Sequence, residues 1–214
     1  MTTVIIVRHG QSQANLEQWF AGQCHVPLTD LGHKQAELTA AYLDRYPIQH
    51  IYASDLRRAY QTAEHTANRR GIAIVPDTDF REILAGEWEG LRFDEIAQRY
   101  PESHRIWKEH VGRSQPDGGE SVAEVSARVC RRLDELIQKH RGECFAVFTH
   151  AIPARSLACR WLGHPIEEAE LVPFCSNASV TVVEYDENGN FSILHYGYDG
   201  HLGDLISTLP KGKV

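Results

Sequence analysis

Short runs of β-branched and aromatic residues alternate with longer segments of helical periodicity along most of the chain, and this alternation limits the fold more than any other feature. Strands that alternate with helices favour a mostly parallel sheet covered by helices. We therefore predict an α/β sandwich. Its predicted strands cover residues 3–7, 50–53, 72–75, 144–149, 179–184 and 191–195.

The segments between these strands carry the signals of helix starts and ends. Thr29-Asp30 can cap a helix that ends before Pro47, and Gly71 and Gly163 follow the expected ends of two others. The last two strands are separated by DENGN, which predicts an antiparallel hairpin at one edge of the sheet. Further helices are predicted over residues 56–70, 120–139 and 152–162.

The composition bounds the class of protein. A length of 214 residues, with 42% hydrophobic and 24% charged residues, is typical of one globular domain. The formal net charge of −7 argues against a nucleic-acid partner, because phosphate backbones reward clustered positive charge. Five scattered cysteines without a CxxC pair suggest neither a disulfide framework nor a zinc ribbon. With no signal-peptide pattern and no apolar run long enough to span a membrane, we expect a cytoplasmic protein without a membrane partner.

Polar residues that follow the predicted strands are the first candidates for a functional site. Two apolar strands end in VIIVRHG and CFAVFTHA, which places Arg8, His9 and His150 at one edge of the sheet if the strands are parallel neighbours. Ligands bind at the carboxyl ends of the strands in such sheets. Other segments supply further polar side chains, namely Ser54, Arg57, Arg58, Glu82 and Glu87.

Such a group of side chains suits a phosphate ester. Arginines and the N-terminal N–H groups of a helix can bind a dianion by charge-assisted hydrogen bonds. A neutral imidazole can attack phosphorus, and a carboxylic acid can protonate the leaving oxygen. Each residue also has a structural alternative as a solvated residue of a loop. From the residues alone, both interpretations stay open.

Missing motifs argue against several other chemistries. The chain has no cysteine that is followed by an arginine after five intervening residues, no HExxH, no GxxxxGK[ST], no GxGxxG and no GxSxG. These motifs mark cysteine phosphatases, zinc hydrolases, nucleotide-phosphate loops, dinucleotide folds and serine hydrolases. We therefore expect neither a metal nor a cofactor.

Six blocks of the chain occur in the order seen in one known family. In this order and spacing, over about residues 4–185, the chain resembles the histidine phosphatase superfamily, the phosphoglycerate mutase-like proteins. The blocks are VRHGQSQAN, PLTDLGHKQA, SDLRRAYQTA, REILAGEWEGL, DGGESVAEVSARV and FTHA.

The resemblance implies a fold and a set of catalytic residues. The fold is a three-layer α/β/α sandwich around a mostly parallel mixed sheet, in a single domain over residues 1–214 with a helical cap or loop region at about 90–120. His9 is implied as the nucleophile that becomes transiently phosphorylated, and Glu82 as the proton donor that later activates water. The other implied members of the phosphate pocket are Arg8, Arg58 and His150.

The resemblance also implies substrate contacts, and no metal or cofactor. The implied contacts are Asn15, Gln23, Thr29, Ala151, Glu120 and Ser121. The chain departs from the family at three places. His25 stands where an aspartate is common, Ala151 stands where glycine is usual, and Arg57 lies beside Arg58, of which the motif favours Arg58 as the anion ligand.

Phosphatases and mutases of this family share the pocket and differ in the acceptor of the phosphoryl group. The segment LAGEWEGLRFDEIAQRYPE resembles the phosphatase branch, so we expect a phosphomonoester hydrolase that releases phosphate. Mutase-type phosphotransfer and a catalytically weak phospho-ligand-binding regulator are the alternatives. The oligomeric state stays open between a monomer and a homodimer.

The substrate is expected to be a small phosphorylated metabolite. Residues 93–116 mix aromatic and cationic side chains. They predict either an amphipathic helix that packs Ile96, Tyr100, Ile106 and Trp107 on the sheet, or a set of cations that contacts a second anionic group of the substrate.

Overall fold

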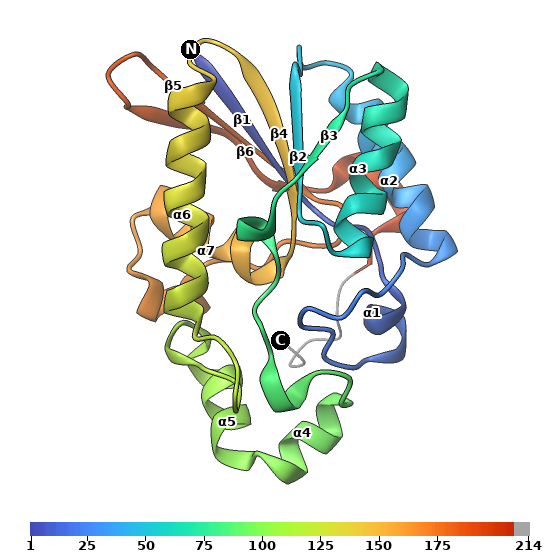
Figure 1. Cartoon of the computed structure of the whole chain (residues 1–214), viewed down its shortest axis with the longest axis vertical. Helices are drawn as coiled ribbons and strands as arrows, with labels where there is room; N and C mark the ends of the chain where they lie inside the picture. Colours follow the sequence, from blue (N-terminus) through green and yellow to red (C-terminus); the bar gives the residue numbers. More distant parts are fainter. Residues whose placement is uncertain (208–214) are drawn as a thin grey trace.

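The computed structural model describes residues 1–207, and a central sheet runs through the middle of them (Figure 1). In these residues the sheet consists of β1 (Thr2–Arg8), β2 (His50–Ala53), β3 (Ile74–Pro76), β4 (Cys144–Thr149), β5 (Val180–Tyr185) and β6 (Phe191–Tyr198). Their spatial order is β3-β2-β4-β1-β5-β6. The strands β1 to β4 are parallel to one another, while β5 pairs antiparallel with β1 and with β6.

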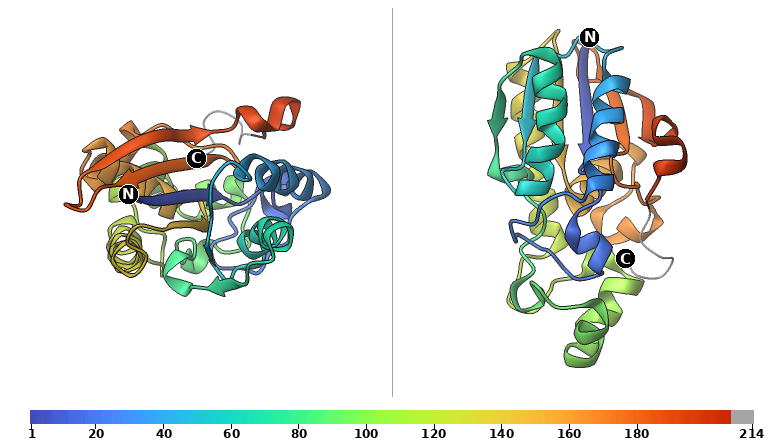
Figure 2. Two further views of the ribbon diagram at one scale, coloured as in Figure 1. Left: turned by 90° about the horizontal axis from the view of Figure 1, so that it is seen from above. Right: turned by 90° about the vertical axis from the view of Figure 1, so that its right-hand side faces the viewer.

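Helices cover both faces of this sheet, as two perpendicular views show (Figure 2). One face packs against α2 and α3, and the other against α6 and α7. Two short helices, α4 and α5, form a cap beyond the carboxyl ends of the parallel strands (Figure 1). The helices are α1 (Gln13–Glu17), α2 (Asp30–Leu43), α3 (Arg57–Arg70), α4 (Phe93–Arg99), α5 (Pro101–Glu109), α6 (Val122–Lys139) and α7 (Ala151–Leu162).

The two-residue period of β1 explains the layers. Val4 and Ile6 belong to the core under α6 and α7, whereas Ile5 and Val7 belong to the core under α2 and α3. All four are buried. A strand that buries both faces reads as a continuous apolar run, as β1 does. The predicted α/β/α sandwich with a mostly parallel mixed sheet is confirmed.

The predicted elements are present with small shifts at their ends. Thr29 caps α2 as predicted, with its side chain accepting the N–H of Gly32. The predicted hairpin is β5–β6 at one edge of the sheet. The strand β6 continues to Tyr198, whereas the sequence predicted its end at His195.

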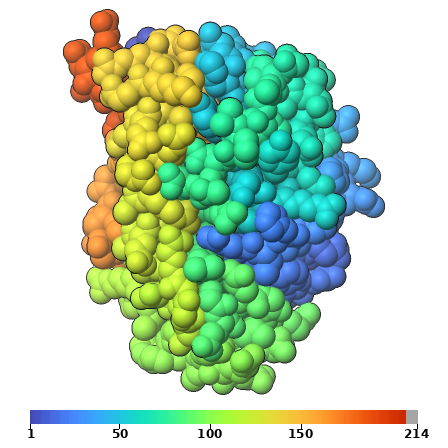
Figure 3. Space-filling view, in the orientation of Figure 1, coloured from blue at the N-terminus to red at the C-terminus, as the bar shows by residue number. Residues whose placement is uncertain are grey.

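The cap differs from the single amphipathic helix that the sequence suggested. It contains two helices, because Pro101 begins α5 and Tyr100 has a non-helical backbone conformation. Proline lacks the N–H of an interior helical residue and restricts the residue before it. On the surface, the cap lies beside the N-terminal segment that follows β1 (Figure 3). The two are joined by a hydrogen bond from the N–H of Phe93 to the carbonyl of Gln18.

The helices were predicted to contain no membrane span. Within residues 1–207, none of the helices combines the length and the apolar character that crossing a bilayer requires.

Candidate active site

The carboxyl ends of three neighbouring parallel strands lie side by side and face the cap. His9 directly follows β1, His150 directly follows β4, and Ser54 directly follows β2. The register pairs Arg8 of β1 with Thr149 of β4. The polar residues that the sequence places after separate strands therefore lie together at one edge of the sheet.

Two glycines allow the turn after His9 to pack against α2. A Cβ atom on Gly10 would lie 2.5 Å from the carbonyl oxygen of Gly32. A Cβ atom on Gly32 would lie 2.0 Å from the carbonyl oxygen of Gln11. Both contacts are with backbone atoms, so a larger residue at either position would displace the turn that carries His9.

The tautomer of His9 is set by its neighbours. Its Nδ1 lies 2.7 Å from the carbonyl oxygen of Gly10, which can only accept, so Nδ1 carries the proton. Nε2 keeps its lone pair and accepts from Nε of Arg58 at 3.3 Å. Burial and the charges of Arg58 and Arg8 hold the pKa of His9 well below its usual value of 6.5. The imidazole is therefore neutral at pH 7.

His150 lies beside His9, with the two ring centroids 5.1 Å apart. Its Nε2 is 2.8 Å from Oγ of Ser54, which also accepts the backbone N–H of Leu56. Burial and the charge of Arg58 lower the pKa of His150 well below 6.5. Its buried Nδ1 has no hydrogen-bond partner among the described residues. Buried polar atoms are rarely left unpaired, so Nδ1 is available for a ligand.

Two buried arginines supply positive charge to the site. The guanidinium of Arg8 donates to the carbonyl of Cys175 at 2.6 Å and lies 4.5 Å from the ring centroid of Phe174. Arg58 donates to two backbone carbonyls of residues 22–24, at 2.8 and 3.0 Å. Burial lowers the pKa of both arginines to about 10, so both stay charged at neutral pH.

Glu82 comes from the segment after β3 and lies at the N-terminus of α7. Its Oε2 accepts the N–H of Ala151 at 3.1 Å, and its Oε1 accepts the N–H of Ile152 at 3.3 Å. The N–H groups in the first turn of a helix lack partners within the helix and attract anions. The carboxylate therefore lies at an anion-binding position beside the two histidines.

An ion pair holds the backbone that carries Glu82. Nε of Arg128, on α6, is 2.7 Å from Oε1 of Glu120, and the two side chains are only 16% and 18% exposed. The same guanidinium donates to three backbone carbonyls, those of Asp79, Arg81 and Glu82, at 2.7, 2.8 and 3.1 Å. The position of Glu82 thus depends on Arg128.

One cavity of about 590 Å³, a volume that includes space open to solvent, is bordered by several of these residues, namely Arg8, His9, Arg58, Glu82, Ala151, Ile152 and Phe174. The charged side chains on its lining are Arg8, Arg58 and Glu82. We call the aromatic part of the lining the aromatic wall; it consists of Trp19, Phe20, Phe93, Trp107 and Phe174.

Of the six implied substrate contacts, Asn15 and Ala151 border this cavity. The Oδ1 atom of Asn15 accepts hydrogen bonds from Ser12 and Asn177. Its amide nitrogen is then the group left to donate to a ligand. Ala151 contributes its N–H to the start of α7.

The other four implied contacts do not border the cavity and have partners elsewhere. Thr29 caps α2 and Ser121 caps α6. Glu120 pairs with Arg128. The side chain of Gln23 donates to the backbone carbonyl of Glu82.

The departures from the family pattern also have defined places. His25 is exposed. Of the adjacent arginines, Arg57 is exposed and Arg58 borders the cavity, which agrees with the choice of Arg58 by its motif. The cations of the cap do not border the cavity, to which the cap contributes Phe93 and Trp107. Ile96 and Trp107 are buried, as the packing alternative predicted, but Trp107 packs against Phe20 and Trp88 beyond the ends of the strands and not on the sheet (Figure 1).

The sequence did not single out Asn177, which supports the site from the segment before β5. Its Nδ2 donates to the carbonyl of His9 at 3.1 Å and to Oδ1 of Asn15 at 3.2 Å. A lone asparagine outside any motif offers no signal that could have found it. Ser54 was named as a strand-end residue and a helix start, and its contact with His150 depends on the order of the strands in the sheet.

Comparisons with known proteins agree with this geometry. A family model described as histidine phosphatase superfamily (branch 1) matches residues 4–198. Phosphoserine phosphatase 1 of Hydrogenobacter thermophilus is 34% identical over 212 residues, 99% of either chain. The structure of Bacillus stearothermophilus YhfR has a TM-score of 0.90 at 30% identity, covering 94% of this chain and 100% of that one. A mycobacterial glucosyl-3-phosphoglycerate phosphatase in complex with VO3 has a TM-score of 0.82 at 28% identity, covering 92% and 99%.

Proposed function

Because the chain belongs to the histidine phosphatase superfamily and is a phosphomonoester hydrolase, we propose that His9 carries the phosphoryl group from the ester to water. The observation that supports this proposal most is the buried, neutral imidazole of His9. Its unprotonated Nε2 borders a cavity with two charged arginines. A neutral imidazole with a free lone pair is the form that attacks phosphorus.

In the first step, the phosphoryl oxygens bind to Arg8 and Arg58. Nε2 of His9 then forms a bond to phosphorus as the bond from phosphorus to the alcohol oxygen breaks. Glu82 gives its proton to that oxygen, and the alcohol leaves.

In the second step, water attacks the phosphohistidine. Glu82, now a carboxylate, takes a proton from the water as its oxygen bonds to phosphorus. The bond from phosphorus to Nε2 of His9 breaks, and inorganic phosphate leaves. Throughout both steps, the two arginines and the Nδ1–H of His150 stabilise the charge on the transferred group.

The lining of the cavity supports a substrate class. Its charged side chains all belong to the phosphate-binding end, and the aromatic wall borders the rest. We therefore propose a small phosphate monoester with a single anionic group, whose alcohol part packs against the aromatic wall. Residues 1–207 place no further cation on the lining to bind a second phosphate.

A panel of esters tests this proposal. Wild type is expected to hydrolyse phenyl and benzyl phosphates with higher kcat/KM than sugar bisphosphates. Phe93→Ala is expected to lower kcat/KM for the aryl ester by roughly tenfold, because a contact of about 1.4 kcal/mol is lost. Phe191→Ala, on the distant hairpin, is the matched control. A preference for bisphosphates, or equal effects of the two variants, would contradict the proposed class.

The pH dependence follows from the lowered pKa of His9. Protonation of Nε2 removes the nucleophile, so activity is lost as pH falls through the pKa of His9. Because burial and two arginines depress that pKa, kcat/KM is expected to hold from pH 7 to below 6.5 and to fall only at lower pH.

The assay uses an ester whose second phosphate ionisation lies well below the usual value of about 6, so that the substrate keeps one charge state. Folding is checked at each pH. Unfolded histidines bind protons near pH 6.5 while buried His9 and His150 do not, so the free energy of unfolding also falls below pH 6.5. A loss of activity centred at pH 6.5 or above, in folded enzyme, would contradict the neutral buried nucleophile.

Ser54 is expected to act as a positioning residue for His150. If its hydroxyl donates to Nε2, the proton of His150 is held on Nδ1, where it can reach the phosphoryl oxygens. Ser54→Ala is expected to lower kcat by about tenfold, the equivalent of one hydrogen bond, and to weaken inhibition by vanadate. Ser54→Thr restores the hydroxyl and part of both losses. A lower melting temperature with unchanged kcat and vanadate inhibition would assign Ser54 a structural role alone.

A further inference from the structure

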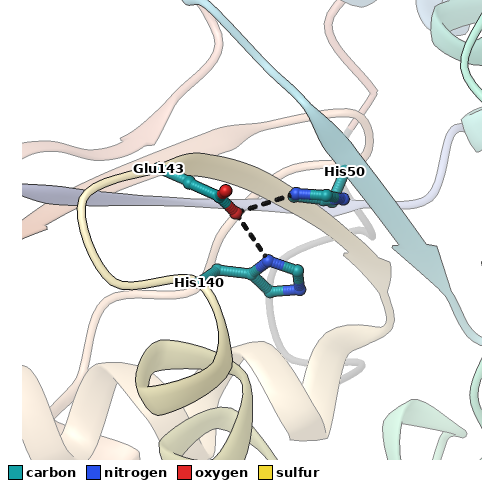
Figure 4. Close-up of side chains that lie close together, drawn as sticks. All are labelled: His50, His140 and Glu143. Atoms are coloured by element: carbon teal, nitrogen blue, oxygen red, sulfur yellow. Dashed lines mark hydrogen bonds and ion pairs between the residues drawn. The ribbon is translucent and has the colours of Figure 1, made fainter.

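A second cluster of polar side chains lies at the amino ends of the parallel strands, where β2 and β4 begin. His50 is the first residue of β2, His140 caps the carboxyl end of α6, and Glu143 directly precedes β4. One carboxylate oxygen of Glu143 contacts both imidazole rings, whose centroids are 4.0 Å apart (Figure 4). Because the catalytic candidates follow the other ends of these strands, this cluster is separate from the cavity that His9 borders.

Three atoms that can bind a metal converge in this cluster. Oε2 of Glu143 is 2.8 Å from Nε2 of His50 and 2.9 Å from Nδ1 of His140. Among residues 1–207, these are the three side chains of this kind whose ligand atoms lie within 4.8 Å of one another. Ligand atoms on one tetrahedral zinc ion lie about 3.4 Å apart. The two distances to the carboxylate oxygen of Glu143 would therefore have to lengthen by about half an ångström each to admit an ion.

The surroundings hold two of the three side chains in place. The side chain of His140 is only 5% exposed, and its Nε2 lies 2.8 Å from the hydroxyl of Tyr52. Lys139 donates to the same hydroxyl at 3.0 Å. Metal-binding histidines usually make such an outer hydrogen bond with their second nitrogen. The backbone of Glu143 is fixed by the N–H of Thr3, which donates to its carbonyl.

The other side of the cluster faces solvent. The side chains of His50 and Glu143 are 38% and 39% exposed. An ion can therefore enter without unfolding, and water can complete its coordination. Two imidazole nitrogens and one carboxylate oxygen suit zinc and its neighbours in the first transition row, whereas magnesium and calcium prefer oxygen ligands alone.

We propose that His50, His140 and Glu143 bind one divalent transition-metal ion, with zinc as the best fit to these donors. The ion ties the carboxyl end of α6 to the starts of β2 and β4. The ion stabilises the amino ends of these two strands and takes no part in the transfer of the phosphoryl group.

Calorimetric titration of chelator-treated protein with ZnCl2 tests the site. Wild type is expected to bind one ion in this site, and His50→Gln and Glu143→Gln to weaken that binding at least tenfold. His140 is left unchanged because it is buried. His65→Gln is the matched control, since Nε2 of His65 pairs with Nδ1 of His33 at 3.1 Å outside this cluster. The control is expected to bind zinc as wild type does.

Two further readouts separate a bound ion from a lost hydrogen bond. Zinc is expected to raise the melting temperature of wild type by a few degrees and that of Glu143→Gln by less. Cobalt bound to wild type is expected to give the visible absorption of a tetrahedral site, absent in Glu143→Gln. Equal zinc binding in all four proteins, loss only in His65→Gln, or no binding by wild type would overturn the proposal and leave a hydrogen-bonded cluster alone.

Discussion

Replacing His9 by alanine is expected to lower kcat for phosphate monoesters by on the order of 10⁴-fold or more, because no other imidazole of residues 1–207 borders the cavity. Nε2 of His9 is unprotonated, buried and held against Arg58. A water molecule that attacks the ester directly would lack the phosphohistidine step. Steady-state hydrolysis of 4-nitrophenyl phosphate by the purified variant measures the loss.

The matched control is His25→Ala, which removes an exposed histidine from the segment before α2. Its kcat is expected to equal that of wild type. Melting temperatures of both variants show whether the chain has folded. A folded His9→Ala protein that keeps more than a few per cent of wild-type kcat would show that His9 is not the nucleophile.

Glu82→Gln is expected to slow the hydrolysis of alkyl phosphates by roughly 10² to 10³-fold, the range of general acid catalysis. An alkoxide leaving group needs a proton as the ester bond breaks, whereas 4-nitrophenolate does not. Phosphorylation of His9 by 4-nitrophenyl phosphate is therefore expected to change little. Single-turnover rates with the two kinds of ester measure the difference.

Glu87→Gln is the matched control for the acid. Glu87 is five residues further along the chain, is exposed, and accepts a hydrogen bond from the hydroxyl of Tyr100. Its replacement is expected to leave both esters unaffected. An equal loss for alkyl and aryl esters in Glu82→Gln would contradict the role as proton donor and indicate that the residue only maintains the site.

The placement of His9 and His150 follows from rules that act within short stretches of sequence. Each follows an apolar run, and the carboxyl ends of parallel strands share one edge of a sheet. The order of the strands makes β1 and β4 neighbours, so the two histidines meet. The roles of these residues came from the resemblance, since a strand-end histidine has an ordinary structural alternative.

Glu82 and the aromatic wall could not be placed by strand rules. Glu82 lies in an irregular segment, and its position depends on the guanidinium of Arg128 and the first turn of α7. The rings of the aromatic wall come from three segments that are far apart in the sequence. These are the segment before β2, the cap after β3 and the segment before β5. Contacts of this kind depend on how distant segments pack, which periodicity within one segment does not encode.

Glu120 and Ser121 show how a family block can mark a structural role. The resemblance implies that both contact the substrate, which stays a prediction, and in the structure Ser121 caps α6 while Glu120 pairs with Arg128. Their influence on the reaction passes through the backbone of residues 79–82. We infer that the block DGGES serves the site by holding the segment that carries Glu82.

The most direct test is to capture the phosphorylated enzyme. Wild type is mixed briefly with excess 4-nitrophenyl phosphate, denatured in base, digested and analysed by mass spectrometry. The account predicts one added phosphoryl group on the peptide that contains His9, stable in base and lost in acid, and none in His9→Ala. A phosphoryl group on another residue, or rapid turnover by wild type with no covalent label, would contradict it.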